Sequence, residues 1–256
     1  TVFGPSNLAW FEIPPYWRKL LFLNITALRE VVLYHSVGDK LYTTQFHNEQ
    51  LVPSLLPGYN IRLNVYKHNT VFTVLGAVII RSNQNATNGV VHTLSSVMRI
   101  PVSSIYSTIQ ATTGFTLLQQ AVRIAGLVSL LNGTHPLTMF TPSDAAFLKL
   151  SASELKQLMS NPKYLANILE YHILRGTMYT AAFYYEDTVR TFNGKSLTIT
   201  NSGNGKCQRL YFYIIPGGKV KVNGIGLPEQ DVSTTNGVIH IVDTLLFPSG
   251  YNLYST

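Results

Sequence analysis

A histidine and an aspartate lie three residues apart in the string TNGVIHIVDTLLFP, residues 235–248. A carboxylate beside an imidazole can orient it as a general base, which is the chemistry of a catalytic dyad. The segment VIHIV is β-branched and apolar, which predicts a strand whose side chains alternate between two faces. His240 then shares a face with Val238 and Val242, whereas Asp243 points to the opposite face. We therefore interpret His240 as a buried histidine bonded to backbone or to a neighbouring hydroxyl.

The other patterns that could carry chemistry are also incomplete. The seven histidines form no HxxH, HxxxH or HExxH arrangement for a metal. The string GNGKC lacks the upstream glycine and the following Ser or Thr of a phosphate loop, and Gly224-Ile-Gly226 is too short for a dinucleotide fingerprint. A GxSxG nucleophile elbow is absent. We therefore expect no catalytic residues, no cofactor and no metal site, and we expect that the protein is not an enzyme.

The chain repeats itself, since three pairs of strings match in the same order. The pairs are TVFGPSNLAW (1–10) with TMFTPSDAAF (138–147), VVLYHSVGDKLYTTQF (31–46) with ILEYHILRGTMYTAAF (168–183), and TNGVVH (87–92) with TNGVIH (235–240). The offset is 137 for the first two pairs and 148 for the third, so the second copy carries an insertion between Ala182 and Thr235. Ordered matches with so long a period indicate tandem domains rather than a solenoid. In the first copy Ser95 takes the place of Asp243, which also argues against a dyad.

The first part of the second copy has helical signals. Residues 115–134 carry apolar residues at helical spacing, with Thr116 as a candidate N-cap, Gln119 at the third helical position and Asn132-Gly133 as a stop. A strand and a Pro turn follow, and then a helix that Ser143 or Asp144 can cap. Two more helices are expected, the first beginning at Ser151 or Ser153, with Asn161-Pro162 between them.

The second part of the copy is rich in strands. Residues 189–203 hold an Asn-Gly hairpin between alternating runs, and residues 210–224 repeat the device with Pro-Gly-Gly. Asn236-Gly237 marks the turn before the final strand. Helices early and strands late predict an α+β fold with an antiparallel or mixed sheet.

The repeat predicts two domains, residues 1–107 and 108–256. The second is complete, whereas the first begins at the strand TVFGPS, without an equivalent of the helix predicted at 115–134. A domain without that helix would expose apolar surface. We therefore expect the chain to be a fragment in which an upstream segment covers this face.

The composition restricts the class of partner. Only 12% of the residues are charged, against about 25% in an average domain, and the net charge is +7. The positive charge is spread over both copies, with Arg18-Lys19 as the only adjacent cationic pair. Nucleic-acid binders cluster their charge, so we expect no nucleic-acid partner, whereas weak attraction to an anionic matrix polymer or membrane surface stays open.

Compartment signals point outside the cell. The three N-glycosylation sequons begin at Asn24, Asn85 and Asn132, which favours N-linked glycans on a secreted or cell-surface protein. Cys207 is the only cysteine, so no internal disulfide can form. It is either a buried thiol or pairs with another chain or another part of the protein. No apolar run approaches the 18 residues of a membrane span.

Three boxes in fixed order resemble those of fasciclin-like domains. They are Thr-x-Phe-x-Pro-Ser-Asp/Asn, a Tyr-His pair midway, and a closing Asn-Gly-Val-Ile/Val-His. The resemblance covers both copies. It implies that each domain is an α+β sandwich or wedge of about seven strands with several helices. It also implies an extracellular adhesion or matrix protein, whose partner is a cell-surface receptor or another copy of itself. A module that captures polyanions is the alternative.

The resemblance also implies candidate partner-binding residues. In integrin-binding matrix members, an Asp-Ile pair before the closing box and the Tyr-His segment are implicated. The matching positions here are Asp231-Val232 and Tyr171-His172, whereas the first copy has Asn83-Gln84 and so lacks the carboxylate. An integrin-type site needs an acid to complete a bound metal, so the second copy is the candidate. The alternative is that Asp231 caps a turn and Val232 packs in the core.

Overall fold

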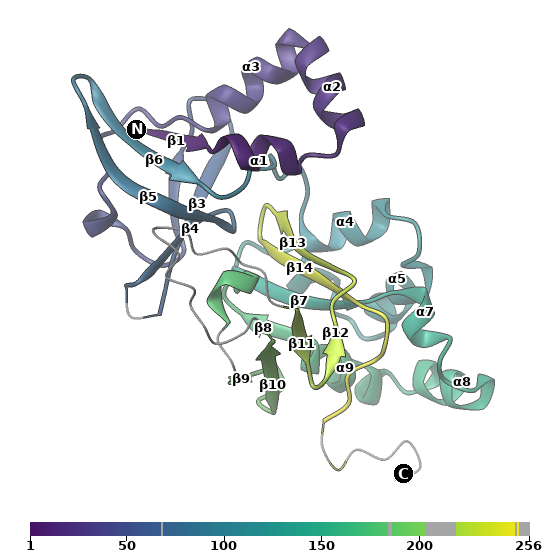
Figure 1. Ribbon diagram of the computed structural model, residues 1–256. Helices are drawn as coiled ribbons and strands as arrows, with labels where there is room; N and C mark the ends of the chain where they lie inside the picture. Colours follow the sequence, from purple (N-terminus) through teal and green to yellow (C-terminus); the bar gives the residue numbers. More distant parts are fainter. Residues whose placement is uncertain (68, 184–185, 203–218, 249, 251–256) are drawn as a thin grey trace. The chain divides into compact units, whose positions relative to one another are not determined.

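The computed structural model describes residues 1–67, 69–183, 186–202, 219–248 and 250 (Figure 1). These residues form two compact units: unit 1 contains residues 1–100, and unit 2 contains the described residues from 101 onward. The expected boundary between residues 107 and 108 lies inside a helix, α4 (Ile105–Ala111), whose buried side chains belong to the core of unit 2. Cys207 and most of the predicted hairpin at 210–224 lie outside the described residues.

Unit 1 has a strand, three helices and then five more strands. They are β1 (Val2–Pro5), α1 (Asn7–Glu12), α2 (Pro15–Leu23), α3 (Ile25–Tyr34), the 3₁₀ helix η1 (Thr43–Gln45), β2 (Gln50–Pro53), β3 (Asn60–Tyr66), β4 (Val71–Val74), β5 (Ala77–Ala86) and β6 (Gly89–Leu94). The strands form one sheet in the order β1-β6-β5-β4-β3-β2, in which β1 runs parallel to β6 and the other neighbours are antiparallel.

Unit 2 repeats this order after an additional helical layer. Its helices are α4, α5 (Thr116–Ile124), α6 (Val128–Leu131), α7 (Asp144–Phe147), α8 (Ala152–Ser160), α9 (Pro162–Tyr171) and the 3₁₀ helix η2 (Thr180–Ala182). Its strands are β7 (Leu137–Pro142), β8 (Ile173–Arg175), β9 (Glu186–Arg190), β10 (Ser196–Asn201), β11 (Val220–Val222), β12 (Ile225–Gly226), β13 (Glu229–Thr234) and β14 (Gly237–Val242). One sheet has the order β13-β14-β7-β8, with β14 parallel to β7, and the other is β12-β11-β10-β9. The predicted α+β class with mixed sheets is confirmed.

Several helix starts follow from local capping, as predicted. Ser151 caps α8 and forms a capping box with Glu154, in which each side chain bonds the other residue's backbone N–H. Asn161 caps α9, accepting from the Tyr164 N–H at 3.1 Å, and Pro162 is its first residue. The Asn-Gly hairpin between β9 and β10 also forms, with Gly194 at a φ of +82°.

The N-terminus of α5 differs from the prediction. Thr116 is the first helical residue rather than the N-cap, and Phe115 at the cap position makes no side-chain bond to the helix. The Asp144 carboxylate instead accepts the N–H groups of Thr116 at 3.1 Å and Leu117 at 2.7 Å. The cap thus comes from α7, where an acid favours the positive end of α5. The predicted single helix is also divided, because Gly126 takes a φ of +69° between α5 and α6.

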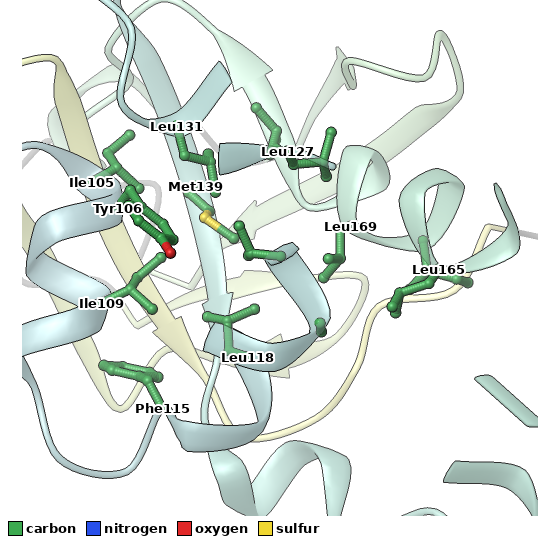
Figure 2. Packing of buried hydrophobic residues seen from close by; sticks show 14 of the residues in the cluster. Ile105, Tyr106, Ile109, Phe115, Leu118, Leu127, Leu131, Met139, Leu165 and Leu169 are labelled. Carbon is green, nitrogen blue, oxygen red and sulfur yellow. The ribbon is translucent and has the colours of Figure 1, made fainter. Parts of the chain in front are cut away.

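The main core of unit 2 lies between its helical layer and the sheet that contains β7 (Figure 2). Figure 2 shows Met139 of β7 among apolar side chains of α4 and α5, with Leu165 and Leu169 of α9 alongside. The fully buried residues that α4 and α5 contribute to this cluster are Ile105, Ile109, Leu118, Ala121 and Val122. Close packing of this kind makes the helical layer part of the folded core, not an appendage.

The predicted turn at Asn236-Gly237 is confirmed, and it has a second role. The buried Asn236 side chain accepts from the Ile105 N–H at 2.9 Å and donates to the carbonyls of Leu131 and Gly133, at 3.0 and 2.7 Å. It therefore ties the start of α4 and the end of α6 to the start of β14. Gly237 lies against β7, so that a Cβ atom there would be 2.1 Å from the Leu137 carbonyl oxygen.

Candidate functional site

Asp231 lies on a bulge in β13. Two residues, Gln230 and Asp231, oppose the single residue His240 of β14 between the pairs Glu229–Ile241 and Val232–Ile239. Asp231 takes a left-handed φ of +61°, which Asp tolerates better than most residues. A bulge of this kind re-aims a side chain away from the regular alternation of the strand. Here it directs the carboxylate toward η2.

The Asp231 carboxylate holds the start of η2. One oxygen accepts the Thr180 N–H at 2.8 Å, and the other accepts the Thr180 hydroxyl. The Asp231 side chain is 29% exposed, so part of it still faces solvent. The neighbouring Val232 is half-buried and packs against the main core of unit 2. These contacts are those of the structural alternative, in which Asp231 caps a turn and Val232 packs in the core.

His240 is fully buried beside this bulge, and both of its ring nitrogens are occupied. Nε2 donates to the Met178 carbonyl at 2.9 Å, and Nδ1 accepts the Asp231 N–H at 3.2 Å. The ring stacks on Phe140 at a centroid distance of 5.5 Å. The interpretation of His240 as a buried histidine bonded to backbone is confirmed. Asp243 follows β14 and is exposed, 3.7 Å from Lys149, so it takes no part in this site.

The Asp231 and His240 side chains do not form an ion pair. Burial lowers the pKa of His240, while the Asp231 carboxylate and the Met178 carbonyl act in the opposite direction. The imidazole is therefore neutral at pH 7, and its Nδ1 lies 3.8 Å from the carboxylate. Its N–H and its lone pair are both used in hydrogen bonds to the backbone, so neither is free for proton transfer or for a metal.

Unit 1 builds the same arrangement with an amide in place of the carboxylate. Asn83 has a φ of +57°, and its N–H donates to His92 Nδ1 at 3.2 Å. His92 Nε2 in turn donates to the Leu41 carbonyl at 2.9 Å. The Asn83 side chain accepts the Thr43 N–H at 3.0 Å and donates to the Thr43 hydroxyl at 2.9 Å. The two bulges therefore share a geometry and differ in charge.

Tyr171 and His172 lie inside unit 2. The Tyr171 side chain is 2% exposed, and its hydroxyl donates to the Ser196 carbonyl at 2.9 Å and accepts from Asn223 Nδ2 at 2.9 Å. His172 is fully buried at the C-cap of α9. A direct contact between either side chain and a partner would require local opening of unit 2, so their role in partner binding stays a prediction.

His172 links the end of α9 to the chain after β14. Its Nδ1 donates to the Ile168 carbonyl at 2.8 Å, and its Nε2 accepts the Leu246 N–H at 3.0 Å. Nδ1 thus bonds a carbonyl in the last turn of α9. Burial lowers the His172 pKa to about 4, so the ring is neutral and adds no charge to the end of the helix. His35 repeats both bonds in unit 1, to Val31 and Met98.

The three sequon asparagines are all exposed. Asn24 caps α3, Asn85 lies on β5, and Asn132 follows α6. The side-chain oxygen of each accepts a hydrogen bond, from the Ala27 N–H, the Tyr42 hydroxyl and the Ser104 hydroxyl respectively. Exposure is the condition that an attached glycan requires, and the presence of sugar stays a prediction.

Among the described residues, no three His, Cys, Asp or Glu side chains are grouped so that they could hold a metal ion. No helix in the same part of the chain has the length and apolarity needed to cross a membrane.

Thr180 is a partner of Asp231 that local sequence patterns do not predict. The two residues are 51 positions apart, so neither local pattern reveals the contact. A signal was nevertheless present, because the Tyr-Thr pair recurs in the matched strings as Tyr42-Thr43 and Tyr179-Thr180. The threonine of this pair contacts the bulge residue in both units, Thr43 with Asn83 and Thr180 with Asp231.

Comparison with known proteins gives a consistent result. A family model described as the Fasciclin domain matches residues 1–101 and again residues 113–248. Over 97% of the chain, the sequence is 31% identical to transforming growth factor-beta-induced protein ig-h3 of Sus scrofa and 29% identical to periostin of Homo sapiens. The chain covers 34% and 28% of these two proteins, so it spans about a third of their length.

Similarity extends to single-domain matches and to a solved structure. The immunogenic protein MPB70 of Mycobacterium bovis is 33% identical over 48% of this chain and 54% of its own length. A structure of a FAS1 domain pair from the insect cell adhesion molecule Fasciclin I aligns with a TM-score of 0.48 and 21% identity, over 96% of this chain and 88% of that one.

Proposed function

Because the chain belongs to the Fasciclin domain family, we propose that it is an extracellular cell-adhesion or matrix protein that acts through protein–protein contacts. The observation that carries the proposal is the tandem match of the family to both halves of the chain. The exposed sequon asparagines and the low charged fraction support an extracellular location, secreted or attached to the outer cell surface. In this proposal the protein carries N-linked glycans and has neither a catalytic role nor a nucleic-acid partner.

The proposed mode of action is weak contact multiplied by tandem display. Two linked domains convert a second binding event into an intramolecular one, so modest affinity per domain suffices for attachment. The partner is a cell-surface receptor or another copy of the chain. Beads coated with the chain distinguish the two, since homophilic contact aggregates them without cells. Beads that stay dispersed while cells still attach would leave the receptor as the partner.

Within this proposal, Asp231 is the receptor-binding residue with a testable charge. The substitution Asp231→Asn reproduces the residue that unit 1 carries at Asn83, so the bulge and the cap on η2 are expected to persist. An amide cannot complete a receptor-bound metal as a carboxylate does. Cell attachment to surfaces coated with D231N is therefore expected to fall by about tenfold or more, with an unchanged urea midpoint.

A matched control removes a carboxylate elsewhere in the same unit. Asp243 is exposed and pairs only loosely with Lys149, so Asp243→Asn makes the same change in net charge away from the bulge. This variant is expected to attach cells normally. If D231N attaches cells as well as D243N does, the carboxylate has only the structural role seen at η2, and the receptor contact must be sought elsewhere.

The alternative function is capture of a polyanion such as a matrix polymer. It is favoured by three exposed cations in one part of unit 2: Arg190 on β9, Lys195 in the turn before β10, and Lys221 on β11. Salt separates the two functions, because exposed charges are screened over about 8 Å at physiological ionic strength. Binding to heparin beads that falls steeply between low and physiological salt, with D231N and the parent chain equal, would favour the alternative.

A further inference from the structure

Helix α2 of unit 1, which lies against α3 (Figure 1), carries an apolar stripe on its solvent side. Tyr16, Leu20 and Leu23 follow one another at helical spacing, so they lie on a single face of the helix. They are 68%, 41% and 73% exposed. Ile25, the first residue of α3, extends the row and is 76% exposed. We call these four residues the α2 stripe.

The matching helix of unit 2, α8, has a largely polar stripe in the same place. At the offset of 137 that relates the copies, the matching residues are Ser153, Gln157, Ser160 and Pro162. Gln157 is half-buried and the other three are exposed, so neighbouring elements leave this side of the helix open in unit 2 as well. The core side of α8 carries Leu158, which matches Leu21 on the other side of α2. The α2 stripe is thus not a core face left bare, and its apolar character has another cause.

The two copies differ at one more point beside this stripe, namely at the residue that caps the following helix. Asn24 caps α3 and Asn161 caps α9, each through its side-chain oxygen. Asn24 begins the sequon NIT, whereas Asn161 begins NPK, in which the proline and the lysine exclude glycosylation. The unit with the apolar stripe is therefore the unit with an acceptor asparagine, and this asparagine lies between Leu23 and Ile25.

Capping leaves the side-chain nitrogen of Asn24 available for a sugar. The cap uses Oδ1, which accepts the Ala27 N–H at 3.1 Å, whereas an N-linked glycan is attached to Nδ2. The start of α3 can therefore form with the sugar in place. Tyr16, the far end of the stripe, lies about 12 Å from Asn24 along the helix axis. The first few sugars of a glycan on Asn24 reach the whole stripe.

We propose that an N-linked glycan on Asn24 lies over the α2 stripe and shields it from water and from other proteins. The inference rests on the proposed extracellular location and gives one of the three sequons a defined task. The apolar C–H faces of the sugar rings pack on Tyr16, on Leu20 and on Trp17, whose ring contacts that of Tyr16 with the centroids 5.5 Å apart. The sugar hydroxyl groups face water. A bulky, solubilising group beside an exposed apolar patch accounts for both differences between the copies with one cause.

A lipid surface is the other occupant that the stripe would fit. Tyr16 and Trp17 are residues typical of membrane interfaces, and the exposed Lys19 would attract anionic headgroups. A hydrophilic glycan on Asn24, however, would stand between the stripe and the lipid. The sequon therefore favours the glycan, and lipid binding becomes an outcome that the experiment must be able to detect.

Removal of one sequon at a time tests the proposal in protein secreted by animal cells. Thr26→Ala abolishes the first sequon and leaves Asn24 to cap α3. Thr87→Ala is the matched control, since it abolishes the sequon of Asn85 on β5. Mass spectrometry of the parent chain is expected to find sugar on Asn24. Should T26A not be secreted, enzymatic removal of the sugar from the folded parent gives the same comparison.

Trp17 reports on the shielding of the stripe. In a Trp10→Phe background it is the only tryptophan, and its side chain is exposed. T26A is expected to raise both the quenching of its fluorescence by acrylamide and the binding of a hydrophobic dye, each by about twofold or more. T87A is expected to change neither.

A polar stripe provides a second control. Leu20→Gln and Leu23→Ser give α2 the residues that α8 carries at the same positions. In this background T26A is expected to leave dye binding unchanged, because most of the apolar surface that the glycan covers is gone.

Several results would overturn the proposal. Sugar on Asn85 but none on Asn24 would leave the stripe without its cover, and equal dye binding and quenching in T26A and the parent chain would place the sugar elsewhere. Binding of the glycosylated parent to vesicles of phosphatidylcholine and phosphatidylserine, lost with L20Q/L23S, would assign the stripe to a lipid surface. Each of these results leaves the proposed function intact. Only the absence of sugar from all three sequon asparagines would also contradict the glycans of that proposal, and cell attachment is measured independently through Asp231.

Discussion

Replacing Gly237 with alanine is expected to destabilise unit 2 by about 3 kcal/mol or more, one of the two largest effects predicted for this chain. The added Cβ would lie 2.1 Å from the Leu137 carbonyl oxygen, and that oxygen belongs to the backbone of the neighbouring parallel strand. The backbone cannot yield as a side-chain end can, so β14 must separate from β7. This separation also pulls Asn236 away from the helical layer it clamps.

The stability of unit 2 can be measured separately from that of unit 1. Both tryptophans, Trp10 and Trp17, lie in unit 1, so their fluorescence follows unit 1 alone. Far-ultraviolet circular dichroism follows both units during urea unfolding. The variant G237A is expected to lower the midpoint of the transition seen only by circular dichroism and to leave the tryptophan transition in place. The matched variant G89A should change neither by more than about 0.5 kcal/mol. A G237A chain as stable as the parent would contradict the close approach of β7 to β14.

Acid is expected to destabilise unit 2 between pH 6.5 and pH 4 through His172. Its ring is fully buried and accepts the Leu246 N–H at Nε2, a bond that exists only while the ring is neutral. The pKa of His172 is lowered to about 4, against about 6.5 in the unfolded chain. The unfolded chain therefore binds the proton first as the pH falls. The stabilisation is fully present above pH 6.5 and is lost progressively down to pH 4, by about 3 kcal/mol in total.

The contribution of His172 can be isolated from that of the carboxylates. The variant His172→Gln keeps a donor and an acceptor but does not titrate, so its free energy of unfolding should fall less between pH 6.5 and pH 4.5. Should this variant fail to fold, the imidazole resonance of His172 in the parent chain gives the same information by NMR. A titration midpoint near 6.5 would falsify the prediction. His35 makes the same bonds in unit 1, and burial also lowers its pKa, so unit 1 is expected to lose stability in the same direction.

The parts of the fold that the sequence could predict are those with local causes. The capping box at Ser151, the helix start at Asn161-Pro162 and the hairpin at Gly194 each depend on a few adjacent residues. Alternation along VIHIV was enough to reject a dyad of His240 with Asp243. The repeat also predicted that both units share an architecture, because homologous segments bury corresponding residues.

The parts that could not be predicted depend on contacts between distant residues. The cap of α5 comes from Asp144, and the bond from the Ile105 N–H to Asn236 spans 131 positions. The sequence Asn236-Gly237 predicts an ordinary turn. The structure shows in addition that Asn236 bonds to α4 and to the end of α6, and that Gly237 lies too close to the Leu137 backbone for a side chain. At the candidate site, the bulge turns Asp231 toward Thr180, which no alternation rule anticipates.

The paired bulges have a consequence for how such tandem proteins can diverge. Asn83 lies beside His92 and Asp231 lies beside His240, and each side chain accepts the N–H of its threonine, Thr43 or Thr180. The hydroxyl bonds run in opposite directions, because Asn83 donates to the Thr43 hydroxyl whereas Asp231 accepts from the Thr180 hydroxyl. Either side chain accepts the threonine N–H, so a change between Asn and Asp at this partly exposed position alters the charge without removing that bond. A duplicated domain can acquire or discard a negative charge here in one mutational step. Two copies that descend from one ancestor need not be redundant, and the second can specialise while the first preserves the scaffold.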